Sequence, residues 1–165
     1  SVNIALLTVT DTRTLETDKS GNILVEKIKK AKHNLVERKI CKDNKEDIKI
    51  ILKEWTLKED LDVIITTGGT GLTGRDITPE ALDEIADKHI PGFGEIFRYF
   101  SLETVGTSSI QSRACAILSN GKYIFALPGS SGGVTDAWDK ILVHQLDINH
   151  KPCNFVELFP RLKEK

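Results

Sequence analysis

Short apolar runs alternate with amphipathic helical patterns through the first half of the chain, and this alternation restricts the fold more than any other feature. The runs at Val2–Val9, Leu35–Cys41 and 61–67 have the length and composition of buried strands. Between them, residues 22–32 and 44–56 repeat apolar side chains at intervals of three and four. Strands that alternate with helices of ten to fifteen residues predict βαβ units on a largely parallel sheet.

A further helix is expected after residue 77. Thr78 is a favourable N-cap and Pro79 suits the first helical position. This helix is predicted to run to about Lys88, because Pro91-Gly92 breaks the pattern. Another short helix is expected over Gly94–Leu102.

The last third of the chain departs from pure βαβ order. Asn120-Gly121 joins Ala114–Ser119 to Lys122–Ala126 and is the strongest two-residue hairpin signal. An antiparallel hairpin would make the sheet mixed.

A further helix is expected near Thr135–Leu146. Pro152–Lys165 is predicted to be an extended, peripheral tail.

Length and charge limit the class of protein. We expect residues 1–165 to form a single domain with its own core. Twenty-four acidic against 23 basic residues give a net charge of −1, which argues against nucleic-acid binding. Apolar runs of about five residues are too short to span a bilayer. SVNIALLTV lacks the basic region of a signal peptide, and three cysteines without a CxxC pair indicate a reduced, cytoplasmic protein.

A glycine-rich segment follows the third predicted strand. Four glycines occur within residues 68–74, directly before the predicted helix start. Glycines allow the backbone to approach a ligand closely, and exposed amides beside a helix N-terminus bind anions. The segment therefore predicts a phosphate cradle. Its expected members are Thr67, Gly68, Gly69, Thr70 and Gly71.

Two other interpretations of these glycines are available. Gly69, Gly71 and Gly74 match the dinucleotide pattern G-x-G-x-x-G, which would indicate an NAD(P)-dependent oxidoreductase. The helix, however, starts four residues after the last glycine, and no strand with an acidic residue follows at the required distance. The glycines could also simply permit a tight turn. No Gly-Lys-Ser/Thr follows, which excludes a Walker A loop.

Carboxylates at strand ends suggest a metal site. Asp76 stands in the glycine-rich segment, and Asp43 and Asp11 follow two other predicted strands. Mg²⁺ is commonly bound through one or two carboxylates plus substrate phosphates, so Asp76 and Asp43 are candidate Mg²⁺ ligands. Asp76 could instead pair with Arg75, and Asp43 could instead cap the helix at 44–56.

The ends of four predicted strands carry most of the glycine and polar residues that could bind a ligand. If the strands are parallel, these ends meet in one crevice. They are Thr10–Arg13, Lys42–Asn44, Thr67–Asp76 and Leu127–Gly133. A polar cluster at 107–113 could be a solvated loop, but Arg113 is a candidate phosphate ligand because arginine binds phosphate with two parallel donors. The further candidate binding residues are Thr10, Asp11, Arg75, Ser108, Arg113, Pro128, Gly129 and Ser130.

Together these segments resemble the MoaB/Mog family of molybdenum cofactor biosynthesis, which is related to the gephyrin G domain. The resemblance spans nearly the whole chain. In chain order it is carried by Val9-Thr-Asp-Thr-Arg13, Thr67-Gly-Gly-Thr-Gly71, Arg75-Asp-Ile-Thr-Pro-Glu-Ala81, Pro91-Gly-Phe-Gly-Glu95, Gln111-Ser-Arg-Ala114, Leu127-Pro-Gly-Ser130 and Pro152-Cys-Asn-Phe155. Ser131-Gly132 departs from the family pattern.

The resemblance implies a three-layer α/β/α domain that binds molybdopterin and assembles as a trimer or hexamer. It further implies a molybdopterin adenylyltransferase that uses Mg-ATP and releases pyrophosphate, with Asp43 and Asp76 as the two functional aspartates. Some MoaB proteins lose the Arg-Asp pair and the activity, whereas Arg75 and Asp76 are both present here. A catalytically silent molybdopterin- or nucleotide-binding scaffold of the same pathway is the alternative.

Overall fold

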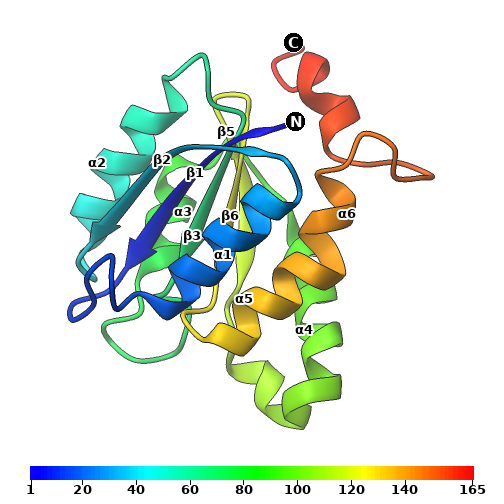
Figure 1. Cartoon of the computed structure of the whole chain (residues 1–165). Coiled ribbons are helices and arrows are strands. Elements are labelled where there is room, and N and C mark those ends of the chain that lie inside the picture. The colour runs from blue at the N-terminus through cyan, green and yellow to red at the C-terminus, as the bar shows by residue number, and fades with distance from the viewer.

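The computed structural model describes residues 1–165 and contains a six-stranded sheet between two layers of helices (Figure 1). The strands are β1 (Asn3–Val9), β2 (Asn34–Cys41), β3 (Val63–Thr67), β4 (Lys88–His89), β5 (Cys115–Ser119) and β6 (Lys122–Leu127). The helices are α1 (Lys19–Lys30), α2 (Lys45–Thr56), α3 (Thr78–Ile85), α4 (Pro91–Val105), α5 (Ser131–Ala137) and α6 (Val143–Gln145). A π-helical stretch, Trp138–Leu142, joins α5 to α6, and 3₁₀ helices cover Gly106–Gln111 and Val156–Arg161.

The sheet is mostly parallel, as the sequence predicts. Its strand order is β2-β1-β3-β6-β5-β4, and β2, β1, β3 and β6 run parallel to one another. The β5–β6 hairpin makes the sheet mixed, since β5 pairs antiparallel with both β6 and β4. Its turn residues Asn120 and Gly121 have φ of 48° and 74°, the positive pair that a tight type I′ turn requires.

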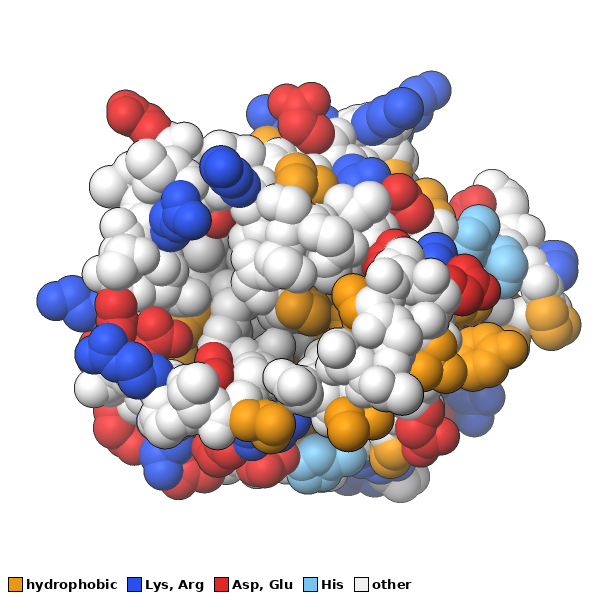
Figure 2. Space-filling model, turned by 90° about the horizontal axis from the view of Figure 1, so that it is seen from below, with side chains coloured by type: hydrophobic (Ala, Val, Ile, Leu, Met, Phe, Trp, Pro, Cys, Tyr) orange, Lys and Arg blue, Asp and Glu red, His pale blue; other side chains and the backbone are white.

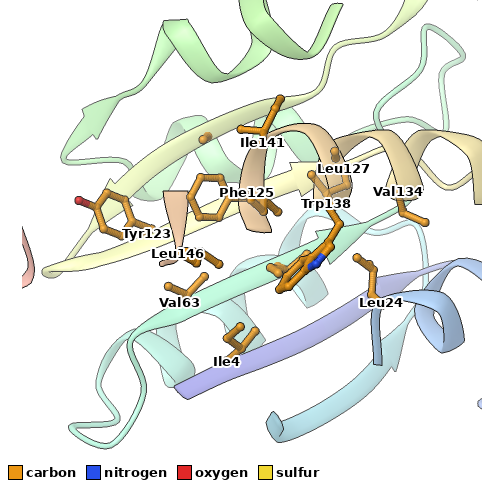
Figure 3. Close-up of a cluster of buried hydrophobic side chains, with 14 of the residues drawn as sticks. Ile4, Leu24, Val63, Tyr123, Phe125, Leu127, Val134, Trp138, Ile141 and Leu146 are labelled. Carbon is orange, nitrogen blue, oxygen red and sulfur yellow. The ribbon is translucent and has the colours of Figure 1, made fainter. Parts of the chain in front are cut away.

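A separate hydrophobic core lies on each face of the sheet. On one face, α1, α4, α5 and the π-helical stretch pack against alternate side chains of the strands. Residues of this core include Ile4, Leu24, Val63, Phe125, Val134 and Trp138 (Figure 3). On the other face, α2 and α3 cover a smaller core that includes Leu7, Ile48, Leu52, Ile64 and Leu82. The arrangement is the expected three-layer α/β/α architecture.

The helix predicted from Thr78 to about Lys88 is shorter than expected. Helix α3 ends at Ile85, and Lys88–His89 form an edge strand instead. The amide of Asp87 donates to the carbonyl of Leu118 at 2.8 Å, so the open edge of β5 captures the backbone that a longer helix would have used. Pro91, expected only to end this helix, occupies the first turn of α4, where a missing amide costs nothing.

The C-terminal segment is not the extended, peripheral tail that was predicted. Val156–Arg161 is helical, and Phe155 and Phe159 pack on Tyr123 with ring centroids 4.7 and 5.7 Å from it. The Tyr123 hydroxyl donates to the carbonyl of Phe155 at 3.0 Å. Pro160 obscured an apolar spacing of four residues, from Phe155 to Phe159, that closes one end of the larger core.

Candidate functional site

Two neighbouring cavities open at the carboxyl ends of β1, β3 and β6, where the surface is hollowed (Figure 2). The first, called here the carboxylate cavity, has a volume of about 420 Å³ and is lined by Thr10, Lys19, Asp43, Gly68, Gly69 and Asp76 among others. The second, called here the serine cavity, has a volume of about 560 Å³ and contains Ser101, Ser108, Ser109, Ser112, Ser130 and Ser131. Ser130 and Ser131 line both, so the cavities adjoin.

The glycine-rich loop forms one wall of the carboxylate cavity. Gly68 and Gly69 have φ of 105° and 72°, which side chains larger than glycine rarely adopt. The amide of Gly68 donates to the carbonyl of Leu127, whereas that of Gly69 has no acceptor within the protein. Gly129 approaches closely, since a Cβ on it would lie 3.3 Å from the Cα of Gly68. Gly69 lines the cavity and its amide is unpaired, which is what an anion site of backbone amides requires.

The helix that follows this loop starts at Thr78, as predicted, but Thr78 does not cap it. No side chain caps α3, and the Thr78 hydroxyl instead donates to the carbonyl of Gly68 at 2.9 Å. Because the helix begins well after Gly69, the glycines do not open a helix as they would in a dinucleotide-binding fingerprint.

Asp43 and Asp76 line the carboxylate cavity, and Asp11 lies beside Asp43 without lining it. Asp11 accepts a hydrogen bond from the amide of Asp43 at 3.0 Å and lies 3.1 Å from Arg75. Burial, and then the charges of Asp11 and Asp76, raise the pKa of Asp43, while Arg75 and the Asp11 bond act in the opposite direction. Asn44, not Asp43, caps α2 by accepting from the amide of Asp47. The Asp43 carboxylate therefore does not cap α2, which was the alternative to its role as a metal ligand.

Asp76 is held in place by its own loop. Its Oδ2 accepts from the amide and the hydroxyl of Thr73, at 2.9 and 2.8 Å. It does not pair with Arg75, which contacts Asp11 instead. No group of three or more acidic, histidine or cysteine side chains is arranged to enclose a metal by itself. The donor set, two carboxylates beside an open anion cradle, fits a Mg²⁺ ion that takes its other ligands from phosphates and water.

The N-terminus of α1 supplies two cavity residues, Lys19 and Ser20, that were not candidates from the sequence, whereas Arg13 comes from the predicted strand end Thr10–Arg13. Lys19, Ser20 and Arg13 line the carboxylate cavity. Asp18 caps the helix by accepting from the amide of Gly21 at 3.0 Å. The signal was present, because Asp18-Lys-Ser-Gly places a good N-cap before a cation at a helix start, where anions bind.

Asp18 itself lies beneath this wall of the cavity. Its carboxylate is 2% exposed, accepts from the hydroxyl of Thr8 at 2.6 Å and pairs with Arg38 at 3.1 Å. A buried carboxylate with these partners fixes the start of α1 against β1 and β2.

Arg113, a candidate phosphate ligand from the sequence, lines neither cavity. Its Nε donates to the carbonyl of Gly71 and its NH2 to the carbonyl of Asp76, each at 2.8 Å. The remaining terminal nitrogen pairs with Glu80. The guanidinium is therefore engaged with the back of the glycine-rich loop.

The other candidate residues divide between the two cavities. Thr10 lines the carboxylate cavity, while Ser108 and Pro128 line the serine cavity. Ser130 caps α5 by accepting from the amide of Gly133 at 3.0 Å. Thr67 lines the carboxylate cavity and donates to the carbonyl of Pro128, which ties the two loops together. Thr70, Gly71 and Arg75 line neither cavity.

Comparisons with known proteins place this geometry in a family. Residues 5–148 match the family described as "Probable molybdopterin binding domain". Molybdenum cofactor biosynthesis protein B of Escherichia coli K12 is 44% identical over 161 residues, which cover 98% of this chain and 93% of that protein. No helix of the structure has both the length and the apolar character needed to cross a membrane.

Solved structures give the same result. The crystal structure of a molybdenum cofactor biosynthesis protein B superposes with a TM-score of 0.89 at 41% identity, covering 99% of this chain and 97% of the other. The molybdopterin biosynthesis Mog protein from Mycobacterium ulcerans superposes with a TM-score of 0.80 at 27% identity, covering 98% and 99%.

Proposed function

The chain belongs to the MoaB/Mog family of molybdopterin-binding proteins, and on this premise we propose that it is a molybdopterin adenylyltransferase of molybdenum cofactor biosynthesis. The reaction would join AMP from Mg-ATP to the terminal phosphate of molybdopterin and release pyrophosphate. Both substrates carry phosphate, and one of them is a heteroaromatic pterin.

The observation that carries this proposal is the position of Asp43 and Asp76 on the cavity that the open glycine loop lines. A phosphate held by the amide of Gly69 would lie on the same cavity as both carboxylates. Clustered carboxylates repel a bare triphosphate, so the arrangement favours a nucleotide that arrives with a divalent cation. The adjoining serine cavity offers hydroxyl groups to a polar ring such as a pterin.

The chain's own residues then act mainly by positioning. The amide of Gly69 and the cations Lys19 and Arg13 bind phosphate oxygens, and the shared wall at Ser130–Ser131 brings the two ligands together. Asp43 and Asp76 would hold Mg²⁺, which supplies neutralisation of charge on the departing pyrophosphate. Transfer between phosphates needs alignment and charge compensation more than a covalent residue.

The second candidate function is a silent scaffold that binds molybdopterin or nucleotide without turnover. The same cavities would serve it, because binding phosphate and pterin groups requires no turnover. The two candidates differ in one observable, the release of pyrophosphate.

A pyrophosphate-release assay with molybdopterin, ATP and Mg²⁺ tests the proposal. The wild-type protein should release pyrophosphate in step with adenylyl-molybdopterin. Asp76→Asn keeps an oxygen that can accept from Thr73 but removes the charge, so turnover should fall about 100-fold or more while molybdopterin still binds. Asp83→Asn, on the exposed side of α3, is the matched control and should retain activity. Wild-type turnover in Asp76→Asn would rule out this role, and a silent wild type would favour the scaffold.

A further inference from the structure

Arg113 connects both ends of the segment that carries Asp76 to the body of the protein. Its backbone amide donates to the carbonyl of Thr70, and its side chain donates to the carbonyls of Gly71 and Asp76, all at 2.8 Å. The three acceptors belong to the two ends of one loop. Arg113 therefore bridges those ends, beside the bonds that Thr78 makes to the carbonyls of Gly68 and Gly69 at the base of the loop.

Few contacts hold the middle of this loop from outside. Residues 72–75 are exposed, and a Cβ on Gly74 would meet nothing within 4 Å. The other external contact is the ion pair of Arg75 with Asp11, in which the Arg75 side chain is 77% exposed. Exposed ion pairs of this kind contribute little to stability. Thr73 orients the Asp76 carboxylate within the loop, and Arg113 anchors the loop backbone to the body of the protein.

Glu80 fixes the direction of the guanidinium. It lies in the first turn of α3 and pairs with the terminal nitrogen of Arg113 that does not contact the loop. The planar guanidinium presents its donors at fixed angles, so an acceptor on one side orients the donors on the other. A lysine could not reproduce this, because its ammonium is a single point of attachment.

We propose that Arg113, oriented by Glu80, is a positioning residue that holds the Gly71–Asp76 loop so that Asp76 stays on the carboxylate cavity together with Asp43. The proposal rests on the proposed function for the use of that carboxylate. It assigns Arg113 no contact with either substrate. Its effect on the reaction is transmitted through the loop backbone.

Hydrogen exchange without any ligand tests the loop directly. The amides of Thr73 and Asp76 are hydrogen bonded within the loop and report its order. Exchange at both should accelerate about tenfold or more in Arg113→Lys and Arg113→Gln. Arg98→Gln is the matched control, since Arg98 donates to the carbonyls of Ser112 and Ala114 but not to the loop. It should leave exchange at the two amides unchanged.

Divalent-cation dependence tests the consequence. In the Arg113 variants the Mg²⁺ concentration for half-maximal pyrophosphate release should rise roughly 10- to 100-fold, and excess Mg²⁺ should restore much of the rate. Affinity for molybdopterin should stay the same. A loss of ATP or molybdopterin affinity with an unchanged Mg²⁺ requirement would mean that Arg113 contacts substrate, and would overturn the proposal.

Two further arms keep the proposal testable. If the Arg113 variants do not fold, Glu80→Gln should show a smaller acceleration of exchange in the same two amides, and unchanged exchange there would overturn the proposal. If the wild type releases no pyrophosphate, the proposed function fails separately. Mn²⁺ binding in the presence of ATP, measured by electron paramagnetic resonance, would then replace turnover, and equal Mn²⁺ affinity in wild type and Arg113→Gln would overturn it.

Discussion

Gly69 combines two constraints that no other residue type satisfies at its position. Its φ of 72° is unfavourable for side chains, and a Cβ there would lie 2.3 Å from the hydroxyl oxygen of Thr78. That hydroxyl donates to the carbonyl of Gly68, so a displaced Thr78 would also release the neighbouring peptide. The cradle can keep its shape only with glycine here.

We therefore expect Gly69→Ala to weaken both the fold and the anion site. The strained backbone should cost about 1–3 kcal/mol of unfolding free energy, measured by urea denaturation. Affinity for ATP, measured by calorimetric titration, should fall in parallel. Gly74→Ala is the control, because nothing lies within 4 Å of its added Cβ and its φ is not positive. Equal stability and ATP affinity in the two variants would contradict the argument.

At the level of single residues, the sequence predicted those site residues whose position follows from the path of the backbone. The glycines and the aspartates at strand ends follow from local chain geometry, and the structure brings Asp43, Gly68, Gly69 and Asp76 to one cavity. The direction of a long side chain is set by distant packing. The Arg113 side chain donates to loop carbonyls that lie some 40 positions earlier in the chain. Its polar sequence neighbours therefore do not predict the direction of this side chain.

At the level of elements, periodic segments were predictable and edges were not. Helix α2 and strands β1 to β3 lie within two residues of their expected bounds. The apolar side chains of α2 face one core, and those of β1 and β3 alternate between the two cores. The predicted end of α3 was wrong because the unpaired edge of β5 binds the backbone that a longer helix would have used. Helix α5 begins at Ser131, earlier than predicted, because Ser130 caps it. The glycines at 132 and 133 had argued against a helix start there.

The connection between α1 and β2 contains a pH-sensitive contact. The Nδ1 of His33 accepts a hydrogen bond from the amide of Val2 at 3.0 Å, and its ring meets the edge of Trp138. Burial lowers the pKa of His33 below its usual 6.5, with Asp147 acting in the opposite direction. The folded state thus favours the neutral ring, which alone can accept at Nδ1.

Stability should therefore fall as the pH decreases through about 6.5, because the unfolded chain then binds a proton more readily than the folded one. The loss should level off below the pKa of the folded state. Urea unfolding between pH 5 and 8 measures this dependence. His33→Gln cannot titrate, so its stability should change less with pH over the same range. An identical pH dependence in both proteins would assign the effect to other groups.

At the scale of the whole molecule, all the candidate chemistry lies at one end and both termini lie near the other (Figure 1). Beside that end, α4 and the following 3₁₀ helix carry an apolar stripe whose side chains are 47% to 78% exposed. The stripe consists of Ile96, Tyr99, Leu102, Val105 and Ile110. Val105 also lines the serine cavity, so a surface packed on this stripe would border the ligand site.

We predict that a second copy of the chain covers this stripe, because contiguous exposed apolar side chains of this extent mark association surfaces. Sedimentation equilibrium should give three or six times the 18.3 kDa chain mass. Tyr99→Glu combined with Leu102→Glu would place two charges in the buried contact and should reduce the mass toward that of a single chain. Leu57→Glu, an exposed apolar position at the end of α2 on the opposite layer, should leave the mass unchanged. A wild-type protein that sediments as a single chain at micromolar concentration would contradict the prediction. A double variant of unaltered mass would contradict it as well, because the stripe would then not be part of the contact between copies.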